Sequence, residues 1–247
     1  MQGASYLLKG LAFLFRLRIL PFVLIPVLLN TVLYYFLIDT GYKHFDLWLN
    51  SWLGALPEWL SFIENILRFL FFALVAIAAA LTFSSVSNLF GAPFYGLLAE
   101  QVTLLATGQA PQQPLNLATL LRMIPRTIGR ELRKLLYYLP RLLLLGIGSL
   151  LTMIPLLAPL QPVMTLLWFI FGARMLSIQY LDYAFDNDEK SFGTMRQSLK
   201  KHRRLSLSFG AITQFALIVP VLPIIFVPAA VCGGTLLYCE KLSDPTI

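Results

Sequence analysis

Four long stretches of this chain contain no Asp, Glu, Lys or Arg, and they constrain the fold more than any other feature. They cover residues 19–38, 69–99, 142–173 and 205–239. A helix of roughly 20 apolar residues is long enough to cross the hydrocarbon core of a bilayer. Only 13% of the residues are charged, where a soluble domain has about a quarter, and 58% are hydrophobic. The sequence predicts an all-α membrane protein that forms a single integral membrane domain over residues 1–247.

The first two stretches predict full transmembrane helices. Residues 19–38 match the length of one crossing. The second stretch begins with an apolar run and becomes polar at a group of serines and Asn88, which predicts a span over residues 69–90. Asn88 could line a pore, although hydrogen bonding between helices explains it equally well.

Prolines interrupt each of the other two stretches three times. Because proline removes a backbone donor and ends helices, we predict helical hairpins over about residues 142–180 and 205–239. The uninterrupted piece 142–154 is 13 residues long, about 20 Å of helix against about 30 Å of hydrocarbon. This favours re-entrant hairpins whose tips stay inside the membrane. The alternative is two ordinary spans, with arms that extend through Arg141 and Arg174.

The distribution of charges predicts the orientation. The segment before residue 19 has three cations and no acid, whereas residues 39–68 have two cations and four acids. Residues 100–141 have six cations and two acids, and residues 174–204 have seven cations and four acids. The positive-inside rule therefore places the N-terminus in the cytoplasm. Cations spread among apolar residues also predict an amphipathic interfacial helix at the N-terminus.

Residues 121–141 form a basic ladder when they are placed on a helical wheel. Apolar side chains lie within about 60° of Leu121, and the cations occupy the opposite face. These cations are Arg122, Arg126, Arg130, Arg133, Lys134 and Arg141. Glu131 lies at the border, where it could pair with an arginine. The cationic face could bind lipid phosphates on the inner leaflet, or it could gather and guide an anion.

Other patterns exclude several classes of function. Asp182, Asp186 and Asn187 resemble a small acidic cluster, which predicts helix-end salt bridges rather than a metal site. The sequence has no nucleophile–base arrangement, metal-ligand spacing or cofactor motif, so we expect no enzyme, no metal and no cofactor. The net charge of +7 follows from the basic cytoplasmic loops and predicts no nucleic-acid partner.

Several motifs resemble one known family along nearly the whole chain. They are GAPFYGLLAEQ (91–101), ATG (106–108), PRTIGRELRK (125–134), YLPR (138–141), LSIQYLDYAFDN (176–187) and VPAAVCGGT (227–235). In this order they resemble CysZ, the family of bacterial inner-membrane sulfate permeases. The resemblance implies sulfate uptake for cysteine biosynthesis, two full spans with hemi-penetrating hairpins, and a homo-oligomer. It implies either proton-dependent transport or a channel-like mechanism.

One departure from the family affects the predicted site. The family's sulfate-contacting stretch has an arginine pair where this chain has Leu20 and Pro21. Arg16 and Arg18 lie just upstream and could replace that pair, or sulfate could bind elsewhere.

The sequence thus gives one set of candidate residues and two candidate functions. The sulfate-binding or pathway candidates are Arg126, Arg130, Arg133, Arg16, Arg18 and Asn88. Glu100 and Glu131 are candidates for proton coupling or for salt bridges. The alternative function is a membrane scaffold whose basic face binds anionic phospholipids without any ion flux.

Overall fold

Every regular element in the described part of the chain is helical. The computed structural model describes all residues except 1–2, 17–19, 54–60, 109–116, 220–221 and 244–247. The elements are α1 (Ala4–Leu14), α2 (Leu20–Leu53), α3 (Ser61–Thr107), α4 (Leu117–Leu151), the 3₁₀ helix η2 (Pro155–Leu160), α5 (Gln161–Asn187), α6 (Phe192–Lys201), α7 (Arg203–Ile218), α8 (Pro223–Leu237) and the π-helical turn η3 (Tyr238–Leu242). The all-α prediction is confirmed for these residues.

The chain divides into two compact units, each of which is described by itself. One unit comprises Leu24–Gly91, and the other combines Met1–Val23 with Ala92–Ile247. The single integral membrane domain stays a prediction, because two such units can belong to one domain.

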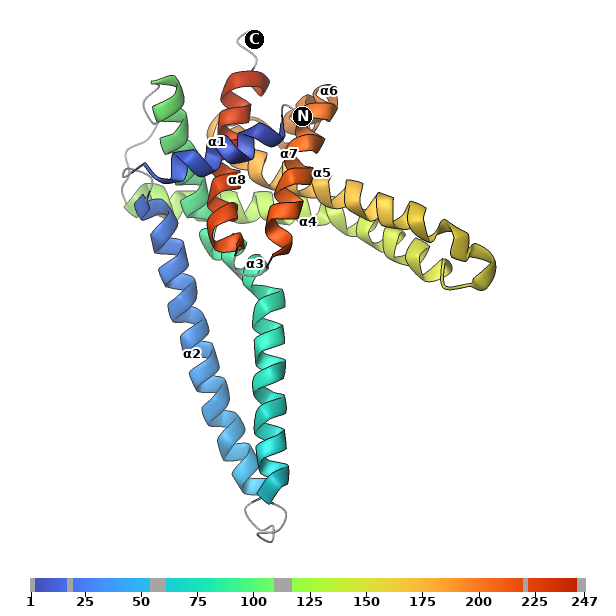
Figure 1. The fold of residues 1–247 in the computed structure, drawn as a ribbon. Coiled ribbons are helices and arrows are strands. Elements are labelled where there is room, and N and C mark those ends of the chain that lie inside the picture. The colour runs from blue at the N-terminus through green and yellow to red at the C-terminus, as the bar shows by residue number, and fades with distance from the viewer. Residues whose placement is uncertain (1–2, 17–19, 54–60, 109–116, 220–221, 244–247) are drawn as a thin grey trace. The chain divides into compact units, whose positions relative to one another are not determined.

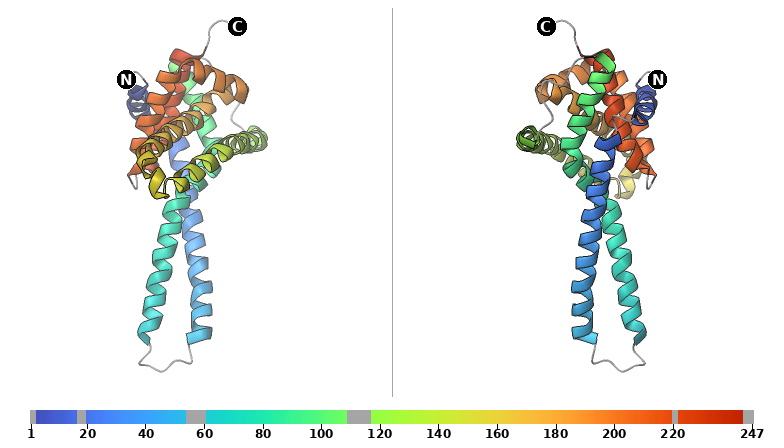
Figure 2. Two further views of the ribbon diagram at one scale, coloured as in Figure 1. Left: turned by 90° about the vertical axis from the view of Figure 1, so that its right-hand side faces the viewer. Right: turned by 90° about the vertical axis from the view of Figure 1, so that its left-hand side faces the viewer.

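Within the smaller unit, segments of α2 and α3 run antiparallel (Figures 1 and 2). The rings of Tyr42 and Phe72 stack with their centroids 5.3 Å apart. Arg68 donates a hydrogen bond of 3.0 Å to the Tyr42 hydroxyl and forms an ion pair with Asp46. These contacts join the two helices through residues 39–68, the acidic segment between the two predicted spans, and Phe72 just after it.

The helices α2 and α3 cover residues 20–38 and 69–90 of the two predicted spans and extend beyond them. The helix α2 has 34 residues and α3 has 47, about 51 Å and 70 Å at 1.5 Å per residue. Residue 19 lies outside the described residues, as do many side chains of both spans. Among the residues described, three helical segments are long and apolar enough to cross a membrane, namely Pro125–Leu151, Pro155–Asn187 and Pro223–Leu242.

The first predicted hairpin is present, but its helical arms are longer than expected. Pro125 and Pro140 lie inside α4, which continues through both of them to Leu151. A proline in a helix removes one donor and bends the helix without necessarily ending it. The helix α5 then returns beside α4, as the views in Figures 1 and 2 agree. The turn between them contains η2, which begins at Pro155.

The second predicted hairpin consists of α7 and α8, with 16 and 15 residues. Pro220, one of its predicted breakers, lies outside the described residues. The helix α1 crosses α8 (Figure 1) at a very close approach. A Cβ atom on Gly10 would overlap the Ala229 carbonyl oxygen, and one on Gly233 would overlap the Tyr6 carbonyl oxygen. Small residues are therefore required where the two backbones touch.

The predicted N-terminal amphipathic helix is α1, and its apolar face packs on protein. Tyr6 and Leu7 are buried, whereas Lys9 is exposed and forms an ion pair of 3.0 Å with Glu240. The Tyr6 hydroxyl donates a hydrogen bond of 2.7 Å to the same carboxylate. Burial, together with this hydrogen bond, raises the pKa of Tyr6 to about 12. The hydroxyl therefore stays a donor at physiological pH and ties α1 to the C-terminal helix.

We predict that Gly10→Ala destabilises the protein by about 1–3 kcal/mol, because the added methyl group overpacks the contact between α1 and α8. Gly146→Ala is the matched control, since a Cβ atom there meets nothing within 4 Å and Ala has the higher helix propensity. Thermal unfolding in detergent should show a lower midpoint for Gly10→Ala alone. Equal midpoints for the two variants would contradict the close packing.

Candidate functional site

The basic ladder of α4 faces two carboxylates of α5. Arg126, Arg130 and Lys134 are spaced four residues apart, and so are Asp182 and Asp186. This spacing places each group on one face of its helix. These cations form ion pairs with the two carboxylates, which confirms the predicted salt bridges and joins the two arms of the first hairpin.

Arg130 lies at the centre of this network and is only 8% exposed. Its Nε atom donates to Asp182 Oδ2 at 3.3 Å, and its Nη2 atom pairs with Asp182 Oδ1. Its Nη1 atom lies 3.1 Å from Asp186 Oδ1 and donates to the Lys190 carbonyl oxygen at 2.9 Å. The guanidinium group is thus held on three sides by its own chain.

Lys134 is buried next to Arg130, with 1% exposure. Its ammonium group lies 2.6 Å from Glu131 Oε1 and 3.3 Å from Asp182 Oδ2, and it sits 5.4 Å from the ring centroid of Tyr183. Glu131 also accepts a hydrogen bond of 3.3 Å from Gln179. Two buried cations are thus balanced by Glu131 and Asp182, so Glu131 serves as a salt-bridge partner here.

Arg126 and Arg133 occupy the open side of the ladder. Arg126 is exposed, and its Nε atom donates to Asp186 Oδ1 at 2.9 Å. Arg133 is exposed and forms no ion pair with any residue that the structure describes. Both residues line a cavity of about 370 Å³ together with Arg130. The other lining residues are Pro125, Gly129, Asp186, Glu189, Lys190 and Ser191.

This cavity has a positive lining. It carries four cations, Arg126, Arg130, Arg133 and Lys190, against the carboxylates of Asp186 and Glu189, for a net charge of +2. Its volume is ample for a tetrahedral oxyanion with some water. The structure brings Arg126, Arg130 and Arg133 to one cavity, and two of them are already paired with carboxylates.

Of the remaining sequence candidates, Arg16 and Glu100 are described, and neither lines this cavity. Arg16 follows α1 and stacks on the Phe13 ring, with 3.8 Å from its guanidinium carbon to the ring centroid. Arg18 lies outside the described residues. Asn88 lies on α3, and its side chain is outside them too. Glu100 is half-buried on α3, where it interacts with another group.

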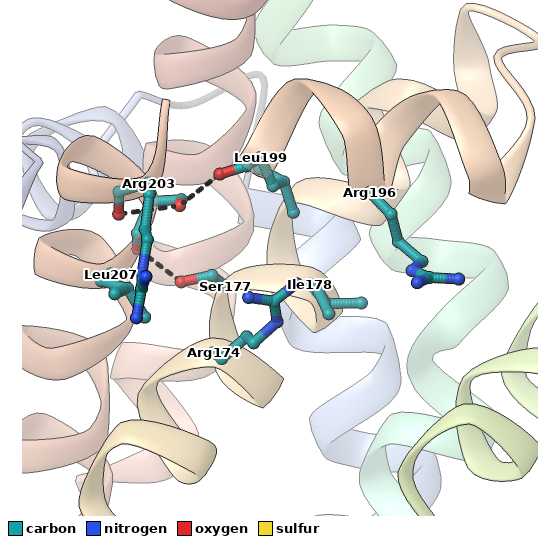
Figure 3. A pocket seen from close by; sticks show the side chains of 8 residues that line it. Arg174, Ser177, Ile178, Arg196, Leu199, Arg203 and Leu207 are labelled. Atoms are coloured by element: carbon teal, nitrogen blue, oxygen red, sulfur yellow. Dashed lines mark hydrogen bonds between the residues drawn. The ribbon is translucent and has the colours of Figure 1, made fainter. Parts of the chain in front are cut away.

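A second group of arginines was not predicted from the sequence. Arg174, Arg196 and Arg203 line a small pocket between α5, α6 and α7 (Figure 3). They come from three helices, so no single helical wheel groups them. Only their common proximity to the ends of the charge-free stretches could have drawn attention to two of them.

A model of one protein family matches residues 6–228, and its description is "Sulfate transporter CysZ/Etoposide-induced protein 2.4". The chain belongs to the CysZ sulfate transporter family. A protein of Pseudomonas aeruginosa strain LESB58 named Sulfate transporter CysZ is 39% identical over 247 residues, which is 100% of this chain and 98% of that protein. A protein of the same name from Pseudomonas syringae pv. tomato is 40% identical over 241 residues, 98% of this chain and 93% of the relative.

A third CysZ relative, from Vibrio atlanticus, is 38% identical over 247 residues, which cover 100% of this chain and 95% of that protein. These bacterial relatives are named as transporters and not as enzymes. Together with the long apolar helices, they make this CysZ family member a multi-pass protein of the bacterial inner membrane. The resemblance seen in the sequence motifs is thereby confirmed.

We predict that Asp182→Asn costs about 3–5 kcal/mol of stability, because it removes the carboxylate that balances buried Arg130 and Lys134. Asp39→Asn is the control, since Asp39 forms an exposed ion pair with Lys43 and should leave the unfolding midpoint nearly unchanged. Thermal unfolding of the purified protein measures both. A midpoint for Asp182→Asn within error of the wild type would refute the structural role of this network.

Proposed function

We propose that this protein takes up sulfate across the bacterial inner membrane and so supplies sulfur for cysteine biosynthesis. The observation that carries the proposal is the cavity of net charge +2 lined by Arg126, Arg130 and Arg133, in a chain whose family is named for sulfate transport. The cavity offers guanidinium forks, which bind oxyanions through paired charge-assisted hydrogen bonds.

The three arginines would act differently on the anion. Arg133 has no competing ion pair among the described residues and would meet sulfate first. Arg126 is exposed and could exchange its bond to Asp186 for a sulfate oxygen. Arg130 is held by Asp182 and would act mainly through its charge. Asp186 limits the affinity of the cavity, and an ion pathway needs binding that is weak enough to release the ion.

We also propose two full spans, in α2 and α3, and two re-entrant hairpins. Residues 142–151, the charge-free part of α4, amount to about 15 Å of helix, half of a hydrocarbon core of about 30 Å. The helix α7 has 16 residues, about 24 Å, and is also shorter than this core, whereas α8 continues into η3, so that Pro223–Leu242 is long enough to cross. The lengths of residues 142–151 and of α7 support hairpin tips that stop within the membrane.

The first tip is suited to an apolar environment. Leu156 is 87% exposed and Met153 79%, so the tip presents apolar side chains to its surroundings. Part of the turn is paired internally, since the Ile154 amide donates to the Leu151 carbonyl oxygen at 3.1 Å and the Leu157 amide to that of Ile154 at 2.9 Å. Lipid provides no such partners, so internal pairing favours this location.

Neighbouring subunits and lipids complete the proposal. Irregular backbone at membrane depth is tolerated where protein covers it, which favours a homo-oligomer. Arg141 is exposed and stacks on Tyr137, with 3.8 Å from its guanidinium carbon to the ring centroid. From there it can reach the phosphates of anionic phospholipids by snorkelling.

We predict that liposomes containing the purified protein take up labelled sulfate and that Arg133→Gln lowers the initial rate about tenfold, as expected for one lost charge-assisted contact of about 1.5 kcal/mol. Lys200→Gln is the control, because Lys200 is exposed on α6 and does not line the cavity. Unchanged uptake by Arg133→Gln would remove the cavity from the pathway. Protein-dependent lipid binding without flux would instead favour the scaffold function.

Proton coupling is tested separately through Glu100, because Glu131 is committed to Lys134 and Gln179. We predict that an inward proton gradient accelerates uptake and that Glu100→Gln abolishes this acceleration while uptake without a gradient persists. Asp39→Asn provides the comparison with a carboxylate outside the predicted spans. Uptake that is indifferent to the gradient in the wild type would indicate a channel-like mechanism.

A further inference from the structure

The pocket between α5, α6 and α7 brings together three arginines that the transport proposal does not use. Figure 3 shows Arg174 on α5, with Arg203 to one side of it and Arg196 to the other. The pocket itself holds only about 10 Å³, the space of about one water molecule. Any larger ligand must therefore lie at its mouth, among the guanidinium groups.

None of the three arginines forms an ion pair with a residue in the described part of the chain. Arg196 lies over the ring of Tyr137, with 4.3 Å between its guanidinium carbon and the ring centroid, a contact that orients the side chain without neutralising it. Arg126 and Arg130, by contrast, have carboxylate partners. Three uncompensated cations around one pocket repel each other, and an anion at its mouth would relieve this repulsion.

The floor of the pocket offers no spare hydroxyl donors. The Ser177 hydroxyl donates to the carbonyl oxygens of Ala173 and Ser206. The Ser206 hydroxyl lies 3.2 Å from the carbonyl oxygens of Leu199 and Arg203. A ligand would therefore be recognised by the guanidinium groups alone, which favours a strongly charged anion over a neutral polar molecule.

The positive end of α7 meets the negative end of α6 at this mouth, because Leu199 in the last turn of α6 also lines the pocket, so the field there comes mainly from the arginines. Arg203 is the first residue of α7, and the preceding His202 makes no side-chain capping hydrogen bond. The first amides of a helix carry about half a positive charge. Figure 3 shows the Arg196 guanidinium pointing away from Arg174 and Arg203, so the direct contacts to an oxyanion would come from the guanidinium forks of Arg174 and Arg203.

The position of these arginines along the chain suggests where the anion comes from. Arg174 directly follows the charge-free residues 142–173, and Arg203 and Arg204 directly precede the charge-free residues 205–239. Cations at such borders reach the layer of lipid phosphates. Water on the same side of the membrane can supply a free oxyanion to the same point.

We propose that Arg174 and Arg203, with Arg196 adding positive charge nearby, form an oxyanion site separate from the cavity of Arg126, Arg130 and Arg133. The ligand is a tetrahedral oxyanion, either free sulfate or the phosphate of an anionic lipid headgroup. Binding at this site requires no transport activity, so its test is independent of the test of sulfate uptake.

The test compares the double variant Arg174→Gln/Arg203→Gln with the control Lys201→Gln/Arg204→Gln, which removes the same charge close by on residues that do not line the pocket. In the first arm, sodium sulfate is titrated into the full-length protein in neutral detergent, and heat of binding is recorded. In the second arm, the protein is placed in nanodiscs of phosphatidylcholine with or without phosphatidylglycerol, and the phosphatidylglycerol retained after extraction is counted by native mass spectrometry.

We expect the double variant to bind one of the two ligands about 100-fold more weakly, since each lost charge-assisted contact lowers the affinity about tenfold. The control should change the affinity for neither ligand. A loss confined to sulfate identifies a free oxyanion, and a loss confined to phosphatidylglycerol identifies a lipid phosphate. If both ligands bind the double variant and the control equally, the proposal is overturned. The single variant Arg203→Gln replaces the double variant in this test if the latter does not fold. Arg203 is exposed, and its substitution should lower the affinity about tenfold.

Discussion

The buried ion network between α4 and α5 is the interaction on which the rest of the structure depends. Arg130 and Lys134 can be buried only because Asp182 and Glu131 lie against them. This pairing fixes the two arms of the first hairpin side by side and sets which face of α4 is turned outward. Arg126 and Arg133 are thereby left on the open side, around the cavity. The network that stabilises the hairpin also determines which cations can meet an anion.

Close backbone contacts build the remainder of the larger unit. Gly10 and Gly233 let α1 lie directly on α8, and a Cβ atom on Gly210 would overlap the Ala173 carbonyl oxygen, which places α7 directly on α5. Lipid provides no hydrophobic force between helices, so close packing of small residues has to hold them together. The two sets of arginines therefore sit on a scaffold whose geometry leaves little room for adjustment.

The arginines of this protein fall into two groups with different surroundings. Arg126 and Arg130 are compensated by carboxylates of the same hairpin, so the cavity beside them combines a moderate positive field with fixed geometry. Arg174, Arg196 and Arg203 have no such compensation among the described residues. A transporter needs weak, exchangeable binding along its path, whereas an uncompensated group suits a ligand that stays bound. The two groups differ because, of these arginines, Asp182 and Asp186 of α5 pair with Arg126 and Arg130 only.

The sequence by itself determined the helical class, the membrane location, both hairpins and the salt-bridge role of Asp182 and Asp186, because charge-free length, proline positions and helical spacing are local properties of the chain. The family followed from the resemblance of its motifs. The helix α4 continues through Pro125 and Pro140, as the helical wheel over residues 121–141 assumed, because one missing donor does not outweigh a continuing helix. Only the tertiary structure decided which arginines are compensated. Arg130 and Arg133 look alike on a helical wheel, yet one is enclosed by Asp182 and the other is exposed. One pocket is lined by Arg174, Arg196 and Arg203 only because three helices pack together. No residue pattern along a single helix could predict this pocket.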